Sequence, residues 1–388
     1  MNSYAVNLAQ LKFWMVVLLA MFTYVPLTRQ QSRVWGLTAL NILFLKLYLA
    51  TSEVIAVLAA IALVFLVINI VPNLRFGTAA TICLFGFTIL LFVVYKFPAR
   101  QFLGHDNNVL NVLAMLSYSY ITIRILDMLR EVSTLDCRAP SFPETVNYLI
   151  PFHMLAAGPV QSYSEFLGNP SLPRNLTATQ SLHAIERITL GVFKKYVMAM
   201  LLKRLFLSGF TIGGSYFFIE AQMFYIWLYL DFSGLSDIAK GIGDLIGVGT
   251  PENFNHPFLA RNMIDFWERW HISFSQFIRR NIFIPLQVAM MRKTGGLYPL
   301  PCASFALGLS FLLCGLWHHI DFPGLLWGIF HAIGVISTNL YRDRLTRLLG
   351  PKGVRIYLAN RWIRIAATIV TFEYVALTLA IVGALAWK

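Results

Sequence analysis

The chain has 388 residues, of which 57% are hydrophobic and only 13% are charged. A soluble domain typically carries about 25% charged residues, so this composition excludes an ordinary soluble protein and indicates an integral membrane protein. The formal net charge of +13 would suggest a nucleic-acid partner in a soluble chain. In a membrane protein, Lys and Arg instead gather in cytoplasmic loops near anionic lipid headgroups, so we expect membrane lipid and no nucleic acid as a partner.

Apolar runs of about 20 residues predict membrane-spanning helices. The first quarter of the chain contains such runs at residues 11–27, 34–50, 54–71 and 77–95. Arg29 and Arg33 follow the first run, whereas only Glu53 follows the second. Because basic residues gather on the cytoplasmic side, this distribution predicts an N-terminus outside the cytoplasm.

The middle of the chain is less uniformly apolar. Residues 147–158 are too short and too interrupted by proline to span a membrane, which predicts a re-entrant or interfacial segment. His153 lies in this segment, and we expect it to be a structural histidine. Residues 179–207 predict a long helix in which Lys194 and Lys195 interrupt the apolar run at the cytoplasmic interface.

The strongest functional signal lies in residues 229–284, where charged and amide side chains are concentrated between apolar segments of membrane length. Polar groups at membrane depth are expensive and usually mark a ligand path or a reaction centre. A second polar cluster, residues 316–332, follows one apolar run later. We expect the two segments to meet in space, with His271 and His318 facing one cavity.

A simpler explanation of His271 stays open at this point. Trp267, His271 and Phe274 are spaced by four and three residues, which places them on one face of a predicted amphipathic helix. A histidine on the apolar face of such a helix can also be a core residue that is bonded to a carbonyl oxygen.

Acids and histidines in this half of the chain could suggest a metal or haem site: Asp231, Asp237, Asp244, His318, His319 and His331. No histidine stands at ligand spacing from the acids. Pro323 and Gly324 separate the histidines, so we expect no metal. The four cysteines form no C-x-x-C pair, and we expect neither a disulfide framework nor a thiol nucleophile.

The end of the chain supports the same orientation. Residues 342–364 contain seven Lys or Arg and one acid, which is typical of a cytoplasmic connector, and the last apolar run, 366–387, then ends outside. We expect about 10 or 11 spans in all. The chain is read as a single membrane domain, 1–388, with N-terminal spans (1–108), a core (109–340), and the basic connector and last span (341–388).

Several segments resemble the membrane-bound O-acyltransferase (MBOAT) family. They are LAAGPVQSYSEF, RITLGVFKKYV, DFSGLSDIAKGIGDLIG, PENFNHPFLARN, DFWERWHISFSQFIRRNIFIPL, LWHH and GIFHA. The chain is most similar to the bacterial branch, which contains the alginate O-acetylation protein and the D-alanyl transfer protein of teichoic acid modification. The resemblance covers residues 110–339. It implies an all-α polytopic fold with short re-entrant or interfacial helices around a central tunnel.

The resemblance also implies roles for individual residues. The characteristic W-H histidine of the family corresponds to His318, and the histidine of the R-W-H-x-S motif of the branch corresponds to His271. We expect His318 to be the general base and His271 to orient or polarise the acyl donor. Further candidates for contact with substrate are Asn255, Trp270, Trp317 and Asp231.

The implied reaction moves an acyl group from a cytoplasmic thioester, acyl-CoA or an acyl-carrier protein, to a hydroxyl of a cell-surface polysaccharide or glycopolymer. We expect no permanently bound cofactor. The acyl group stays open between acetyl, D-alanyl and a longer chain, and the reaction class expected first is O-acyl transfer of groups other than aminoacyl or D-alanyl. An outer-face transferase is a further expected partner. The expected location is the bacterial cytoplasmic (inner) membrane, with both termini extracytoplasmic.

Two other classes of protein stay open. A multi-span transporter or flippase for a lipid-linked or acylated substrate would also contain broken helices and buried charges. Such transporters often have repeated halves, and residues 1–190 and 191–388 show no correspondence. A glycosyltransferase that uses a lipid-phosphate sugar would need an acidic residue in an outer loop, for which His105-Asp106 is the only indication.

Overall fold

The computed structural model describes residues 8–70, 86, 88–90, 112, 117–134, 137–156, 158–168, 176–210, 214–318 and 320–386. Within these ranges the chain forms helices and no β-strand, and the prediction of an all-α protein is confirmed. The predicted span at residues 77–95 lies almost entirely outside the described residues, as do His105, Asp106 and His319.

The chain forms two compact units. The N-terminal unit comprises Met1–Val192 and Leu235–Pro251, and the C-terminal unit comprises Phe193–Gly234 and Glu252–Lys388. Both polar clusters that carry the functional signal fall mainly in the C-terminal unit, so this unit is the one that positions the candidate site.

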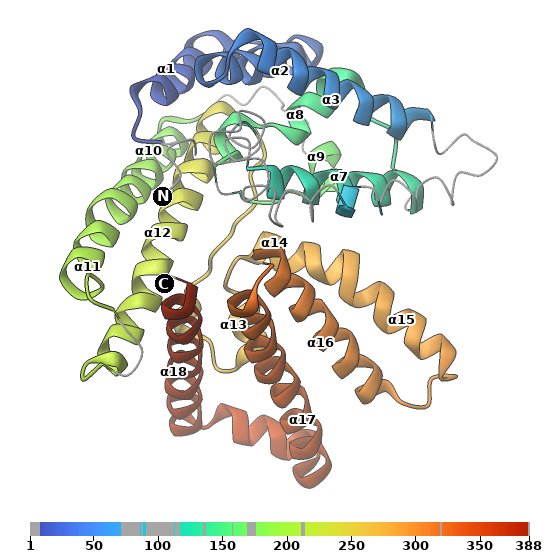
Figure 1. The fold of residues 1–388 in the computed structure, drawn as a ribbon, viewed down its shortest axis with the longest axis vertical. Helices are drawn as coiled ribbons and strands as arrows, with labels where there is room; N and C mark the ends of the chain where they lie inside the picture. The colour runs from blue at the N-terminus through green and yellow to red at the C-terminus, as the bar shows by residue number, and fades with distance from the viewer. Residues whose placement is uncertain are drawn as a thin grey trace. The chain divides into compact units, whose positions relative to one another are not determined.

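The N-terminal unit is built from short and long helices (Figure 1): α1 (Leu11–Leu19) with the π-helix η1 (Ala20–Tyr24), α2 (Gln30–Tyr48), α3 (Thr51–Ile70), α7 (Tyr118–Thr134), α8 (Phe142–Leu149), η3 (Phe152–Met154), α9 (Tyr163–Gly168) and α10 (Ala178–Phe193). The predicted runs 11–27, 34–50 and 54–71 are all helical. The predicted interruption within 147–158 is confirmed, because α8 ends there and only a 3₁₀ turn follows.

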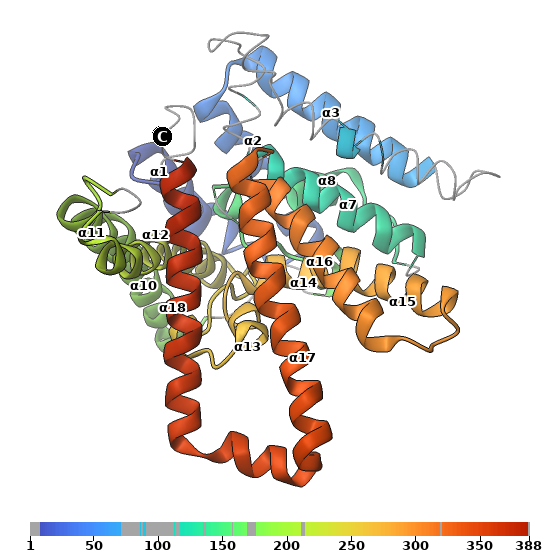
Figure 2. The ribbon, with the colours of Figure 1, turned by 60° about the horizontal axis from the view of Figure 1, so that its bottom comes forward.

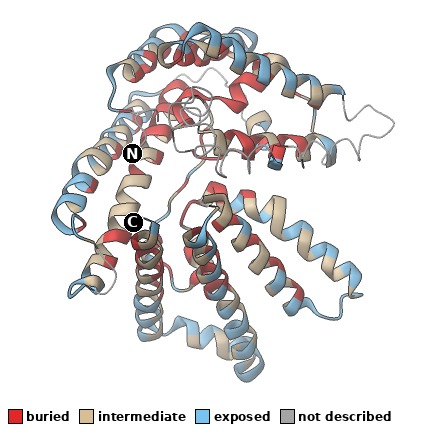
Figure 3. Cartoon of the chain, viewed as in Figure 1, coloured by how far each residue is buried: buried red, intermediate tan, exposed pale blue. Residues whose placement is uncertain are grey.

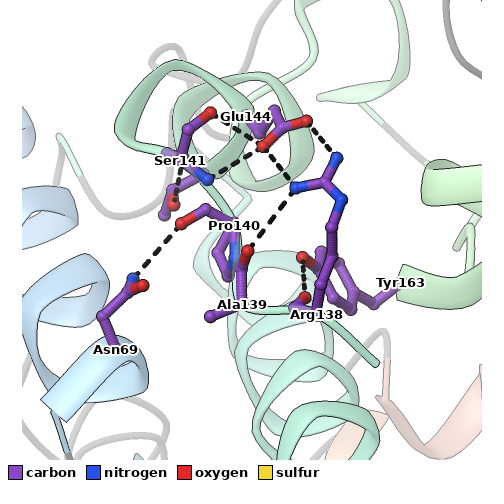
Figure 4. A network of polar contacts seen from close by, with 8 residues as sticks. Asn69, Arg138, Ala139, Pro140, Ser141, Glu144 and Tyr163 are labelled. Atoms are coloured by element: carbon purple, nitrogen blue, oxygen red, sulfur yellow. Dashed lines mark hydrogen bonds and ion pairs between the residues drawn. The ribbon is translucent and has the colours of Figure 1, made fainter. Parts of the chain in front are cut away.

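The start of α8 is held by a polar network (Figure 4). Glu144 accepts hydrogen bonds from the backbone and side chain of Ser141, which form a capping box. It also accepts two bonds from the Arg138 guanidinium, at 2.9 and 2.5 Å. The Tyr163 hydroxyl donates to the Arg138 carbonyl, and the Asn69 amide donates to the Pro140 carbonyl. These bonds tie α3, α8 and α9 to the segment that precedes α8.

The C-terminal unit contains both short and long helices: η4 (Lys194–Met198), α11 (Ala199–Phe206), α12 (Phe217–Ile246) up to Gly234, η5 (Pro257–Leu259), α13 (Met263–Trp267), α14 (Ile272–Ile278), η6 (Arg279–Phe283), α15 (Ile284–Lys293), α16 (Pro299–His318), α17 (Phe322–Ala359) and α18 (Arg361–Ala386). The helix α10 continues through η4 into α11, which confirms the predicted long helix at 179–207 and places a π-helical turn at Lys194 and Lys195.

The helices α16 and α17 pack closely because glycines face each other between them. A Cβ atom on Gly315 of α16 would lie 2.2 Å from the carbonyl oxygen of Gly324, and one on Gly328 of α17 would lie 2.6 Å from the carbonyl oxygen of Phe311. Small residues at such a crossing let two helix backbones approach. This approach sets the position of the end of α16, where His318 lies.

The expected basic connector is largely helical. The helix α17 continues through residues 342–359, bends at Gly350 (φ 64°) before Pro351, and is followed by α18, so that the two long helices are joined at one end (Figure 2). A basic composition indicates that a segment is exposed to water. It does not distinguish an exposed loop from an exposed helix, so composition alone predicted only a connector.

Four described helices, α3, α16, α17 and α18, are long and apolar enough to cross a membrane. Many positions of these helices are exposed (Figure 3). Some of the exposed side chains are large and apolar, for example Phe305 on α16 and Val370 on α18, which are 56% and 68% exposed. In water such surfaces would be unfavourable, whereas in lipid they are the expected outer face.

Candidate active site

A loop and a short extended pairing position the first predicted histidine. Phe254 and Trp270 form an isolated antiparallel bridge, and the backbone N–H of Asn255 donates to the Arg269 carbonyl at 2.9 Å. This pairing holds the segment between α13 and α14 against the loop that follows α12. His271 comes directly after the bridge.

The predicted continuous amphipathic helix through Trp267, His271 and Phe274 is wrong. The helix α13 ends at Trp267, His271 has left-handed backbone angles (φ 44°, ψ 50°), and α14 begins at Ile272. The physical reason is that a carbonyl distant in the sequence replaces the helical hydrogen-bond acceptor. The N–H of Ile272 donates to the Asn253 carbonyl at 3.0 Å and not to a carbonyl one helical turn before it. Helical periodicity in the sequence does not reveal such a partner.

The imidazole of His271 is oriented by Asn253. Its Nδ1 lies 3.0 Å from the Asn253 side-chain oxygen, which also accepts a bond from the Ser273 hydroxyl at 2.8 Å. Because an amide oxygen only accepts, Nδ1 carries the proton and Nε2 presents a lone pair. The ring is 3% exposed. Burial, and secondarily the neighbouring His318, lower the pKa of His271 well below its ordinary value, which keeps the ring neutral.

His318 lies in the last turn of α16, close to His271. The Phe274 ring packs against both histidines, with its centroid 5.0 Å from that of His271 and 6.1 Å from that of His318. Trp317 stacks on the same ring at 4.6 Å. Phe274 therefore links the short helix α14 to the end of α16.

His271 and His318 line one cavity of about 260 Å³. The structure thus brings together the two histidines as expected, although their catalytic roles stay predictions. His331 of α17 lines the same cavity, and the remaining lining is apolar or aromatic, including Phe232, Trp267 and Trp327. No Asp or Glu is among the described residues that line it.

The other predicted site residues are distributed differently. Trp270 lines the cavity, and Trp317 lies beside it against His318, with ring centroids 4.8 Å apart. Asn255 is exposed and contributes its backbone to the bridge, and Asp231 forms an ion pair with Lys195 at 2.5 Å. Neither Asn255 nor Asp231 lines the cavity. Asp231 is therefore occupied by an ion pair with a lysine 36 residues earlier in the chain. The spacing of residues within the segment 229–284 could not predict this pair.

A second cavity, of about 460 Å³, adjoins the first in the same unit. Trp267 and Phe274 line both cavities. The second cavity has polar residues at its border, among them Gln276, Arg279 and Arg342. The described residues contain no group of three His, Cys, Asp or Glu side chains that could hold a metal ion.

Sequence patterns did not identify two residues of this site, Asn253 and His331, as functional candidates. Asn253 is one of three asparagines in a proline-containing loop, and its sequence neighbourhood does not distinguish it from Asn255. His331 was considered only as a metal or haem ligand. The signal that could have found it is its type: an ionisable residue inside an apolar span is a functional candidate.

The sequence matches the model of MBOAT, the membrane-bound O-acyltransferase family, over residues 6–379. The chain belongs to this family. The resemblance noted in the sequence motifs is thereby confirmed, and family membership together with the apolar helices makes this MBOAT chain a multi-pass membrane protein.

Several characterised or named relatives are similar to this MBOAT chain. It is 26% identical to the teichoic acid D-alanyltransferase of Streptococcus thermophilus, over 71% of this chain and 69% of that protein. It is 34% identical to the peptidoglycan O-acetyltransferase of Helicobacter pylori, over 49% of this chain and 36% of that protein. It is 28% identical to the probable alginate O-acetylase AlgI of Pseudomonas aeruginosa, over 69% of this chain and 50% of that protein. The names of these relatives describe the transfer of D-alanyl or acetyl groups to teichoic acid, peptidoglycan and alginate.

Proposed function

We propose that this chain is a membrane-embedded O-acyltransferase that moves an uncharged acyl group, acetyl first, from a thioester to a hydroxyl of a cell-surface polysaccharide or glycopolymer. The observation that carries the proposal is the shared cavity of His271 and His318 in a chain of the MBOAT family. The thioester is acyl-CoA or an acyl-carrier protein on the cytoplasmic side, and the acceptor approaches from outside.

In the proposed reaction, His318 takes the proton of the acceptor hydroxyl while the hydroxyl oxygen attacks the acyl carbonyl carbon. The tetrahedral oxyanion then collapses, the C–S bond breaks, and the leaving thiolate takes the proton from His318. General base catalysis by a positioned histidine typically contributes about 10²- to 10⁴-fold to the rate. No covalent intermediate with the protein is needed.

His271 supports the reaction by orienting substrate. Its Nδ1–H is committed to Asn253, so the neutral ring offers only the lone pair of Nε2 to the cavity. Of the two expected roles, orientation therefore fits better than polarisation of the acyl carbonyl, which would need an N–H donor. A polyol acceptor with several hydroxyls can donate such a bond to Nε2.

The lining of the cavity favours an uncharged acyl group. A D-alanyl group carries an ammonium, and burial of an ammonium without a carboxylate partner is strongly unfavourable. The cavity residues include no carboxylate, whereas acetyl needs only apolar walls and a partner for its carbonyl oxygen.

The test is chemical analysis of the cell envelope from cells that make this protein and cells that lack it. Mild alkali releases ester-linked acids, which mass spectrometry identifies. We expect acetate to depend on the protein and D-alanine not to. If neither acid depends on it, and labelled substrate instead crosses the membrane without acyl donor, the proposal is overturned in favour of transport.

A further inference from the structure

His331 is the third histidine of the cavity, and neither of its ring nitrogens has a hydrogen-bond partner. The residue is 1% exposed. Its neighbours are aromatic rings, with centroids 4.2 Å away for Trp327 and 5.2 Å away for Trp267. The face of an aromatic ring is no conventional acceptor, and no indole N–H of the described residues donates to the imidazole, so its polar partner has to come from the cavity.

Such a group is unusual for a side chain that only fills space. Buried polar atoms in folded proteins are nearly always hydrogen-bonded, and an unpartnered one destabilises the fold. Among the described residues, the other two buried histidines each have a bond, from His271 to Asn253 and from His153 to Thr250 at 3.1 Å. An apolar ring at position 331 would avoid the penalty, so the imidazole is better explained by a ligand.

The three imidazoles of the cavity differ in what they can offer to a substrate. His271 presents a lone pair, because its N–H is used by Asn253. A base at His318 also has to present a lone pair. His331 retains an uncommitted N–H, because one nitrogen of a neutral imidazole always carries a proton and neither of its nitrogens has a partner among the described residues. Acyl transfer needs a donor for the oxygen that becomes negative.

We propose that His331 binds the carbonyl oxygen of the transferred acyl group, donating a ring N–H to it in the thioester and in the tetrahedral oxyanion. The ligand class is an uncharged ester or thioester carbonyl. The Trp327 ring packs against both His318, the proposed base, and His331, the proposed carbonyl-binding group, with ring centroids 5.0 and 4.2 Å apart. This inference rests on the proposed O-acyltransferase function.

The experiment compares His331→Phe and His331→Gln with the wild type in two measurements. The first is the initial rate of thiol release from acetyl-CoA by membranes that hold equal amounts of protein and envelope polymer. The second is the unfolding temperature in detergent. We expect His331→Phe to lose about 10²-fold in rate, as when an oxyanion donor is removed, while its unfolding temperature stays equal or rises. His331→Gln keeps an N–H donor and recovers part of the rate.

Two controls separate this inference from alternatives. His153→Phe removes a buried histidine that has a partner, and its unfolding temperature falls because Thr250 loses a bond. His183→Gln changes an exposed histidine, 74% accessible, and leaves both measurements unchanged. An active His331→Phe, or one with a lowered unfolding temperature that His331→Gln does not rescue in rate, overturns the inference. A wild type no faster than His318→Ala overturns the proposed function instead.

Discussion

At the scale of single residues, Asn253 decides what His271 can do. Its side-chain oxygen accepts from both the His271 ring and the Ser273 hydroxyl, so one amide fixes the proton position of one ring and the orientation of a second donor. All three residues belong to a loop and a helix start, not to a long helix. The site therefore depends on a local polar arrangement inside an otherwise apolar surrounding.

Replacing Asn253 by Ala should lower both activity and stability. Two buried donors would lose their acceptor, which typically costs about 1–3 kcal/mol of unfolding free energy. The freed ring of His271 can rotate or change tautomer, and misplacement of about 1 Å can cost about 10²-fold in rate. Initial rates of acyl transfer and chemical denaturation in detergent measure the two effects. Ser273→Ala is the control, because it removes one donor and leaves the His271 bond. A wild-type rate in Asn253→Ala contradicts this account.

The sequence predicted catalytic residues only where a family motif contains them. His271 and His318 stand in motifs of the MBOAT family, and the cavity contains both. Asn253 and His331 were not assigned, because their roles follow from hydrogen bonds made or missing in three dimensions. Asp231 and Asn255 share the polar segment of the site but lie away from the cavity.

At the scale of elements, the contact of α16 with α17 positions His318. Gly315→Ala should destabilise the protein, because the new methyl would lie 2.2 Å from the Gly324 carbonyl oxygen and would push the helices apart. Overpacking of this kind typically costs about 1–3 kcal/mol, and the movement of α16 should also lower the rate. Gly308→Ala in the same helix is the matched control. Its methyl would meet only Ile336 at 3.8 Å, so we expect unchanged or slightly raised stability. Equal unfolding temperatures of the two variants would refute the packing argument.

The start of α8 supplies a pH-dependent contribution to stability. Hydrogen bonds from Arg138, and further bonds from Ser141, lower the pKa of Glu144 to about 2. In the unfolded chain a glutamate titrates near about 4.3. The stabilisation from the ionised carboxylate is therefore fully present above about pH 4.3 and is lost as the pH falls toward 2.

Glu144→Gln tests this contribution. We expect the wild type to unfold at a higher temperature than Glu144→Gln at pH 7, and the difference to shrink as the pH is lowered through 4 toward 2. Unfolding followed by circular dichroism in a detergent stable to acid gives both values. A difference that does not change with pH would show that the carboxylate charge is not responsible.

The elements themselves were predicted well where a long apolar run defines them, as at 34–50, 54–71 and 179–207. Prediction failed where a distant partner overrides local periodicity. The helix expected through His271 is broken by the bridge between Phe254 and Trp270, a pairing that lies outside the local window that periodicity samples. The predicted basic connector after residue 342 is largely helical, as the continuation of α17.

At the scale of the whole molecule, the composition that excluded a soluble protein also explains how the site works. Four described helices are suited to lipid, and three imidazoles of the C-terminal unit line one largely apolar cavity. In such surroundings hydrogen bonds and developing charges interact more strongly than in water, which favours a preorganised site. The central claim is that His271 and His318 act together in one acyl transfer.

That claim is tested most directly by the initial rates of His271→Ala, His318→Ala and the double variant, with thiol release from acetyl-CoA and equal protein in each membrane sample. Residues that act as a unit in one step have non-additive effects. We predict that each single variant loses at least about 10²-fold and that the double variant is no slower than the slower single one. A single variant at the wild-type rate, or losses that multiply in the double variant, would contradict the claim.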